Sequence, residues 1–394
     1  MKFDTAVIGS GMSGLMASIY LSERGLNTVL VSRGDPICSI SSGCIDIAGT
    51  NRNTLDAVDR FPAEHPYHKV GRKEIISSIQ YFRDLMGENG FEYEGDIEKN
   101  RSILTPIGKK RITSLVPFTM KHADITEGDT FHIISFKDIK DFYPSYLTGK
   151  FPETGVSVFD AETYTTMGIA TIMDNEDFLA RFISWIKEQN IRCDIIGIPS
   201  ILGVTKTAEI FKRLESETGK IFFEIPTLPP SIPGLRLYRN LKKIAEKKGV
   251  SFCGAAEITD FRSENNRILD LKIKKPGRPD YVEADAFILA TGSFVSGGLF
   301  SDRNKFKETV FNLPVYTPES GELFNEDFFK LGHPIEKSGI LVNDRFIPEN
   351  SDYVNLFAAG SILAYSETMK YQCGHGMAIA TGIAAAKSVE EYRK

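Results

Sequence analysis

The feature that most constrains this chain is a glycine pattern between its first strand and its first helix. Residues 3–8 are a short apolar run typical of a buried parallel strand, and residues 13–24 have the apolar spacing of a helix. A second β-branched run follows at residues 28–32. Three glycines with G-x-G-x-x-G spacing join the first strand to the helix: Gly9, Gly11 and Gly14. This βαβ order within about 30 residues predicts a dinucleotide-binding unit.

Each glycine has a physical role in such a unit. Gly9 permits the tight turn after the strand, Gly11 lets the backbone approach a pyrophosphate, and Gly14 lets the helix pack closely on the strand. The first helical residues, Met12 and Ser13, present N–H groups at the positive end of the helix dipole. The alternative is a purely structural turn, but the full strand–turn–helix–strand context favours a cofactor site.

The end of the second strand departs from the usual pattern. An acidic residue roughly 20 positions beyond the glycines commonly binds the ribose hydroxyls, whereas this chain has Ser32 and Arg33. Ser32 retains one hydrogen-bonding hydroxyl. Arg33 is either a phosphate ligand or a solvated surface charge. The adenosine part of the cofactor is therefore held differently here, or is absent.

Two later segments also place small residues after apolar strands. One predicted strand ends near residue 289, and another covers residues 353–360 before a final helix at 376–392. The positions in these segments that we expect at the cofactor are Ala290, Thr291, Gly292, Gly360, Gly374, His375, Gly376 and Met377. The start of the final helix suits negative charge on a ring of a bound cofactor. His375 is there either a proton-relay group or a cap and packing residue.

Residues 250–290 predict a small β-meander with turns near Asn265 and at Pro276-Gly277. Before it, four prolines in residues 224–237 predict extended or turn structure, and a basic helix is expected at 238–248.

Taken in order, these segments resemble the flavin domain of the fumarate reductase/succinate dehydrogenase flavoprotein group. They resemble more closely the B subunits of anaerobic glycerol-3-phosphate dehydrogenases, and the resemblance spans nearly the whole chain. The matching segments are VIGSGMSGL at 7–15, SSGCIDI at 41–47, EIPTLPPSIPGLRL at 224–237, ILATGSFVSGGL at 288–299, NLFAAG at 355–360 and CGHGMAIATGIAAA at 373–386.

The resemblance implies an α/β fold: a Rossmann-like FAD-binding domain with a central parallel sheet and a β-meander, plus a mixed α+β cap domain. The flavin-binding domain is expected to be discontinuous, from residues 1–50, 235–300 and 337–394. The cap, for substrate or partner, is expected from residues 51–234 and 301–336.

The resemblance also implies a function, namely oxidation of glycerol 3-phosphate to dihydroxyacetone phosphate with electrons passing through a flavin to an iron–sulfur partner and quinone. The expected partners are the catalytic flavoprotein (the A subunit) and the iron–sulfur protein (the C subunit) of the same complex. In such a complex this chain either oxidises the substrate or only relays electrons. No paired His/Arg or His/Glu motif marks a catalytic base in the sequence, which favours relay. The family cofactor is often given as FMN, whereas the glycine loop favours FAD because FMN has no pyrophosphate.

Further candidate residues come from the matched segments. A small-residue loop in related flavoproteins passes the cofactor, and its counterparts here are Ser41, Ser42, Gly43 and Cys44. Arg236 is the only charged side chain near the end of the proline segment. We expect it either to bind a substrate phosphate or carboxylate as a catalytic-site residue, or to form a structural ion pair.

Charge, cysteine spacing and the length of the apolar runs argue against several other classes. A net charge of −5 argues against nucleic-acid binding. The five cysteines form no CxxC pair, so no metal site is expected. No apolar run reaches the length of a membrane span, and no secretory signal is evident, which predicts a cytoplasmic protein, peripheral at the inner face of the membrane through a partner.

Two alternatives remain. One is a self-contained FAD-dependent oxidoreductase of the fumarate reductase type that acts on another small acid. The other is a non-catalytic scaffold protein that keeps the flavin fold to bind a partner.

Overall fold

The computed structural model describes residues 2–49, 52–229, 231–274, 279–302, 305–318 and 323–394, and the chain in it divides into two compact units. The first unit comprises Met1–Ile37, Asp46–Leu85 and Asn240–Lys394, and the second comprises Cys38–Ile45 and Met86–Arg239. These boundaries differ from the predicted ones. Residues 52–85 and the described part of 301–336 pack with the first unit, and residues 38–45 pack with the second.

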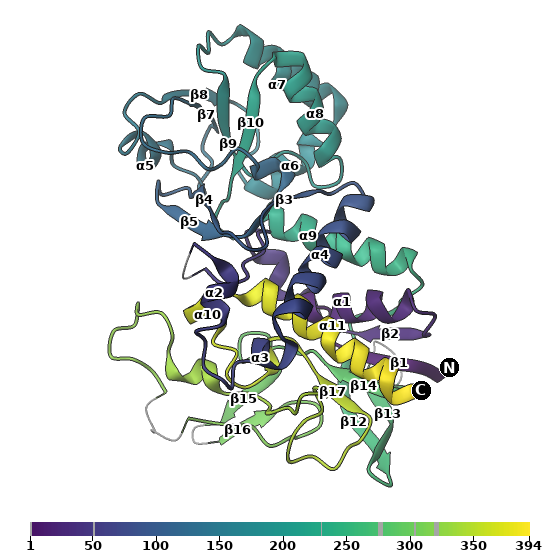
Figure 1. Cartoon of the computed structure of the whole chain (residues 1–394). Helices are drawn as coiled ribbons and strands as arrows, with labels where there is room; N and C mark the ends of the chain where they lie inside the picture. The colour runs from purple at the N-terminus through teal and green to yellow at the C-terminus, as the bar shows by residue number, and fades with distance from the viewer. Residues whose placement is uncertain (1, 50–51, 230, 275–278, 303–304, 319–322) are drawn as a thin grey trace. The chain divides into compact units, whose positions relative to one another are not determined.

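The first unit contains one large sheet with helices against it (Figure 1). Its strands are β1 (Lys2–Ile8), β2 (Thr28–Val31), β11 (Ser251–Cys253), β12 (Glu257–Glu264), β13 (Arg267–Lys274), β14 (Pro279–Leu289), β15 (Leu299–Asp302), β16 (Lys305–Glu308) and β17 (Leu356–Ala358). Its helices are α1 (Met12–Ser22), α2 (Thr54–Val58), α3 (Pro66–Val70), α4 (Arg72–Glu88, which ends just inside the second unit), α10 (Thr368–Tyr371) and α11 (Gly374–Arg393).

The seven-stranded sheet has the order β11-β2-β1-β14-β13-β12, and β17 also pairs with β14. Strands β11, β2, β1, β14 and β17 are parallel, and β12, β13 and β14 form an antiparallel meander. The predicted central parallel sheet and β-meander are therefore confirmed. The predicted turn at Pro276-Gly277 lies outside the described residues.

The carboxyl ends of the central parallel strands are level. Ile8 at the end of β1 lies opposite Leu289 of β14, which in turn lies opposite Ala358 of β17. On the other side, Ile8 lies opposite Val31 of β2. The chain runs from β1 to β2 on one side and returns to β14 on the other, so the strand order reverses next to β1. Ligands of open α/β sheets bind at this kind of reversal, outside the carboxyl ends.

Helices α1 and α11 lie side by side (Figure 1). Gly382 of α11 is so close to α1 that an added Cβ would lie 2.5 Å from the backbone oxygen of Ser13. This contact joins the two ends of the sequence, because α1 follows the first strand and α11 is the last helix.

The direction of α11 follows from two contacts with the chain around β17. The ring of Phe357, in the middle of β17, lies 6.0 Å from that of Tyr392 near the end of the helix. Gly360, which follows β17, donates its N–H to Thr381 Oγ1 at 3.0 Å. The helix thus runs opposite to β17, and residues 374–380 extend roughly 10 Å farther, past the carboxyl edge of the sheet.

The second unit contains a separate sheet of four parallel strands in the order β10-β9-β7-β8. These strands are β7 (His132–Phe136), β8 (Gly155–Phe159), β9 (Ile195–Pro199) and β10 (Ile221–Ile225). The unit also contains β3 (Tyr93–Gly95), β4 (Arg101–Leu104), β5 (Lys110–Thr113), β6 (Leu115–Pro117), α5 (Pro144–Thr148), α6 (Thr166–Met173), α7 (Glu176–Glu188), α8 (Thr207–Thr218) and the first half of α9 (Ile232–Lys247).

Helices and strands are mixed in this unit as predicted, but the regular parallel sheet was not foreseen. Its core is rich in fully buried aromatic side chains such as Phe131, Phe182 and Phe222. The expectation of extended or turn structure over 224–237 is wrong from Ile232 onward, where α9 already begins. Pro233 explains this result, because proline is well tolerated in the first turn of a helix.

Candidate functional site

The turn after β1 has the geometry that the glycine pattern predicts. Gly9 has φ of +114°, and an added Cβ would overlap the carbonyl oxygen of Ala290 at the end of β14. A Cβ on Gly14 would overlap the carbonyl oxygen of Gly9. Both positions therefore require glycine, one for the turn and one for close packing of α1.

Gly11 differs from its two neighbours because its surroundings are open. Apart from its chain neighbours, no atom of the described residues lies within 4 Å of the position that a Cβ would take, and the backbone is extended, with φ of −69° and ψ of 178°. Gly11 is the N-cap of α1 and, because glycine has no side chain, it leaves the first turn of the helix without a side-chain cap. Met12 and Ser13 begin the helix and are buried. An uncapped helix start beside open space is a cradle for an anion.

The end of β14 lies directly beside this cradle. Ala290 donates its N–H to the carbonyl of Ile8 at 2.8 Å, which continues the ladder between β14 and β1. The next residue, Thr291, has a buried hydroxyl that finds no hydrogen-bond partner among the described residues. Gly292 has φ of +77° and turns the chain away. A buried hydroxyl without a partner is the type of group that a bound ligand satisfies.

The end of β17 meets α1 from the other side. A Cβ on Gly360 would overlap the hydroxyl of Ser13, so the chain after β17 lies against the start of α1. The structure therefore brings three predicted segments together at one edge of the sheet, namely residues 9–14, 290–292 and 360.

The start of α11 holds the last predicted group, Gly374, His375, Gly376 and Met377. Gly376 donates its N–H to the carbonyl of Asp46 at 3.0 Å, and a Cβ there would lie 2.6 Å from the hydroxyl of Tyr67. His375 is half-buried at this helix start. Its role as a proton relay or as a packing residue stays a prediction.

A buried histidine that the sequence did not single out supports this helix start. His65 Nδ1 accepts from the N–H of Tyr67 at 3.2 Å, so Nε2 carries the proton and donates to the carbonyl of Ser366 at 3.2 Å. The Sγ of Cys373, the N-cap of α11, lies 3.8 Å from the same Nε2. Burial lowers the pKa of His65 to about 3 and raises the pKa of the Cys373 thiol well above its usual value. Both groups are therefore neutral at pH 7.

Ser32 and Arg33 follow β2 at the same edge. The Ser32 backbone continues the ladder, since its N–H donates to Cys253 and its carbonyl accepts from Ala256, both at 3.0 Å. Arg33 is exposed, and its guanidinium lies 3.1 Å from where a Cβ of Gly297 would be. This geometry leaves both interpretations of Arg33 open, a phosphate ligand or a surface charge.

The loop of Ser41, Ser42, Gly43 and Cys44 belongs to the second unit. There Arg111 donates to the Ser42 hydroxyl, and Tyr93 donates its hydroxyl to the Gly43 carbonyl at 2.8 Å. Cys44 is fully buried in the hydrophobic core of that unit, with its Sγ 4.0 Å from the sulfur of Met120. Its contact with a cofactor remains a prediction.

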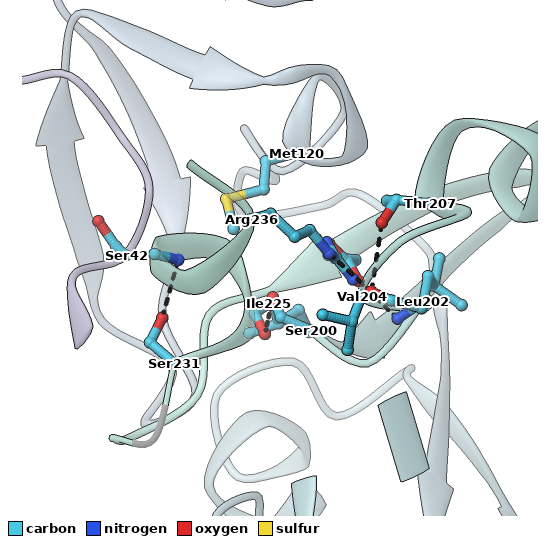
Figure 2. Close-up of polar contacts among 12 residues, drawn as sticks. Ser42, Met120, Ser200, Leu202, Val204, Thr207, Ile225, Ser231 and Arg236 are labelled. Atoms are coloured by element: carbon cyan, nitrogen blue, oxygen red, sulfur yellow. Dashed lines mark hydrogen bonds and ion pairs between the residues drawn. The ribbon is translucent and has the colours of Figure 1, made fainter. Parts of the chain in front are cut away.

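Arg236 is buried in a dense set of polar contacts, and Figure 2 shows it reaching toward the loop that carries Leu202 and Val204. Its two terminal nitrogens donate to Glu224 at 2.6 and 3.0 Å, and its Nε donates to the Gly203 carbonyl at 2.8 Å. The exposed fractions of the two charged side chains are 1% and 0%. This geometry supports the structural ion pair, the second of the two interpretations of the sequence.

Within the described part of the chain, no group of three or more His, Cys, Asp or Glu side chains is arranged to hold a metal ion. Among the described helices, none combines the length and apolar character needed to cross a membrane.

Comparison with known protein families decides to which family the chain belongs. The family described as FAD binding domain matches residues 4–377. The chain belongs to this FAD-binding family. FAD is accordingly the cofactor, which confirms the preference for FAD over FMN. The residues fit it: the open cradle at Gly11 and the start of α1 suit the pyrophosphate, and the unpartnered Thr291 hydroxyl lies on the adjoining strand end.

Relatives of known name match this FAD-binding chain from end to end. The B subunit of anaerobic glycerol-3-phosphate dehydrogenase from Actinobacillus pleuropneumoniae serotype 5b (strain L20) is 25% identical over 426 residues, covering 99% of both chains. The protein of the same name from Pasteurella multocida (strain Pm70) is 24% identical, with the same coverage. These matches confirm the resemblance to this group of B subunits.

Among solved structures, the open conformation of a flavocytochrome c3 fumarate reductase aligns with 9% identity and a TM-score of 0.48. The alignment covers 99% of this chain and 78% of that one. At this score it adds nothing to the assignment.

Proposed function

We propose that this chain is the FAD-carrying B subunit of an anaerobic glycerol-3-phosphate dehydrogenase complex. The observation that carries the proposal is the match to relatives of that name over 99% of both chains. The partners are the catalytic flavoprotein, or A subunit, and the iron–sulfur protein, or C subunit, with quinone as the acceptor. The complex lies at the cytoplasmic face of the membrane, which this chain reaches through a partner.

The residues of the first unit bind and orient the cofactor. Gly11 and the uncapped start of α1 hold the pyrophosphate by backbone N–H groups, and Thr291 offers its hydroxyl to a cofactor oxygen. The positive end of the α11 dipole stabilises negative charge at the flavin ring. Bound FAD supplies the electron-accepting chemistry that the side chains themselves lack.

Within the complex, we assign to this chain the relay of electrons rather than the oxidation of glycerol 3-phosphate. Arg236, the predicted anion ligand, has its guanidinium engaged by Glu224 and Gly203 inside the second unit. That arrangement supports relay, because a charged side chain already paired with a carboxylate is poorly suited to bind a substrate phosphate.

The test begins with the purified chain alone. We expect a yellow protein that releases FAD, identified by mass, at near one per chain. It should not oxidise glycerol 3-phosphate with an artificial acceptor until the A and C subunits are added. A Gly11→Ala variant should fold and bind FAD about tenfold or more weakly, because its Cβ enters the pyrophosphate cradle.

Gly87→Ala, in α4, is the matched control, since outside its own stretch of helix a Cβ there also meets no atom of the described residues within 4 Å. Robust oxidation of glycerol 3-phosphate by the isolated chain would overturn the relay role. Turnover of another small acid without any partner would instead identify a self-contained oxidoreductase. A colourless protein that releases no FAD would indicate a scaffold protein.

A further inference from the structure

Glu367 is a buried acidic residue in the segment that joins β17 to α11. Its side chain is 2% exposed, and Oε1 accepts from the Lys370 ammonium at 2.7 Å. The other carboxylate oxygen, Oε2, is buried and meets no hydrogen-bond donor among the described residues. A buried acceptor without a donor is unfavourable, and more so when it is charged, so an atom of this kind calls for a partner such as a bound ligand or ordered water.

The backbone around Glu367 is held in an unfavourable conformation. Tyr365, Glu367 and Gln372 have φ values of +59°, +33° and +47°, all in the left-handed region that side chains disfavour. Conformations of this kind persist only where surrounding contacts impose them, and they cluster at ligand sites.

Those contacts come from outside the segment. The ring of His65 donates to the carbonyl of Ser366 at 3.2 Å, and the carboxylate of Glu336 accepts from the N–H of Met369 at 3.0 Å. Tyr365 donates its N–H to the carbonyl of Lys337 at 3.0 Å. These contacts with the rest of the first unit impose the left-handed backbone conformation and so keep Glu367 in its buried position.

The carboxylate lies close to the start of α11. Burial raises the pKa of the Cys373 thiol at the N-cap of this helix, and the negative charges of Asp46, Glu336 and Glu367 raise it further. The N–H of Cys373 also donates to the carbonyl of Thr368, the residue after Glu367, at 3.2 Å. The unpartnered acceptor and the helix start therefore belong to one local structure, beyond the carboxyl edge of the sheet.

The pyrimidine edge of the flavin ring has complementary groups. This edge presents an N3–H donor between two carbonyl oxygens. A protein that binds it must therefore offer one acceptor to the N3–H and donors to the carbonyl oxygens on either side. The start of α11 suits a carbonyl oxygen or charge at N1, and a carboxylate suits the adjacent N–H. We infer that Glu367 is a positioning residue for FAD whose Oε2 accepts the hydrogen bond of flavin N3–H. This inference rests on placing the ring at the start of α11, as in the proposed function.

The test combines Glu367→Ala with a cofactor analogue. Apoprotein is titrated with FAD and with N3-methyl-FAD, which lacks the N3–H, and the two dissociation constants are compared. For the wild type we expect methylation to weaken binding about tenfold or more, the effect of losing a hydrogen bond to a charged acceptor. In Glu367→Ala the same methylation should change the affinity less than about threefold.

The flavin midpoint potential is a second readout, and Glu367→Gln is the variant for it. Removal of a negative charge beside the ring favours the reduced anion, so the potential should become more positive. Glu349→Gln is the matched control, because Glu349 is exposed in a different loop, and neither readout should change.

Equal losses on methylation in wild type and Glu367→Ala would overturn the inference. It would also fail if Glu367→Gln left the flavin midpoint potential at the wild-type value. Neither result touches the proposed function, which fails instead when the wild-type chain binds no FAD.

Discussion

The carbonyl oxygen of Ala290 occupies the space into which a side chain on Gly9 would project. These two residues directly follow β1 and β14, neighbouring strands that lie far apart in the sequence. Gly11, by contrast, has no close neighbour beyond its chain neighbours in the part of the chain that the structure describes. The loop thus separates two requirements, close packing at Gly9 and Gly14 and ligand access at Gly11.

Gly9→Ala should destabilise the fold strongly. The new Cβ overlaps backbone atoms of Ala290 and forces a side chain to φ of +114°, so we expect a loss of several kcal/mol in the free energy of unfolding, or no folded protein. Gly25→Ala is the control, because Gly25 also has a positive φ, of +81°, but an added Cβ meets no described atom beyond its chain neighbours within 4 Å, so the change should cost about 1 kcal/mol. Denaturant unfolding measures both. Equal costs would show that the Ala290 contact is unimportant.

Arg236→Met should destabilise the chain by about 3–5 kcal/mol, because it leaves Glu224 as an uncompensated buried charge. Adding Glu224→Leu should recover much of this loss. The control is Arg181→Met, which breaks a 2.8 Å ion pair with Glu162 whose side chains are 49% and 74% exposed, and should cost about 1 kcal/mol or less. Similar costs for both arginines would mean that the buried pair is not structural.

His65 should make stability depend on pH. Its pKa is about 3 in the folded chain and 6.5 in the unfolded chain, so between these values only the unfolded chain is protonated. The stability is complete above pH 6.5 and falls as the pH drops toward 3, by about 2 kcal/mol from pH 7 to pH 5. His65→Asn keeps an N-cap acceptor and should lack this component. Identical losses of unfolding free energy in the two proteins would contradict the assignment.

The exposed and buried cysteines should differ in how fast they are alkylated. Cys193 is partly exposed, whereas Cys38, Cys44, Cys253 and Cys373 are buried, and burial raises the pKa of the Cys373 thiol. Because the thiolate is the reactive form, iodoacetamide should modify Cys193 first, and the others should react only on unfolding. Peptide mass spectrometry follows the order, and rapid labelling of Cys373 in folded protein would refute its buried, neutral state.

Local sequence carried enough information for the parts of the fold that depend on neighbours in the chain. The Gly9 turn, the helix after it and the β-meander all follow from residues within a few positions of one another, and each was predicted. Apolar residues and glycine after later strands also placed residues 290–292 and 360 at the same edge as Gly11.

Residues that find partners far along the chain were not predictable in this way. His65 bonds to Ser366, and neither position carries a motif. Arg236 was noticed as a lone charge, but its partner Glu224 lies in a strand that reads as ordinary apolar sequence. Glu367 has no signal either, because neither its left-handed backbone nor its unpartnered oxygen is visible in residue types.

The pairing of β1 with β14 has a consequence for how the chain is made. Lys2 pairs with Glu283, so β1 leaves the ribosome long before its second partner is synthesised. In the interval the whole parallel sheet of the second unit emerges, with its strands close together in sequence. During that time β1 exposes an apolar, unpaired edge, which is the kind of segment that molecular chaperones bind and that aggregates when left unprotected.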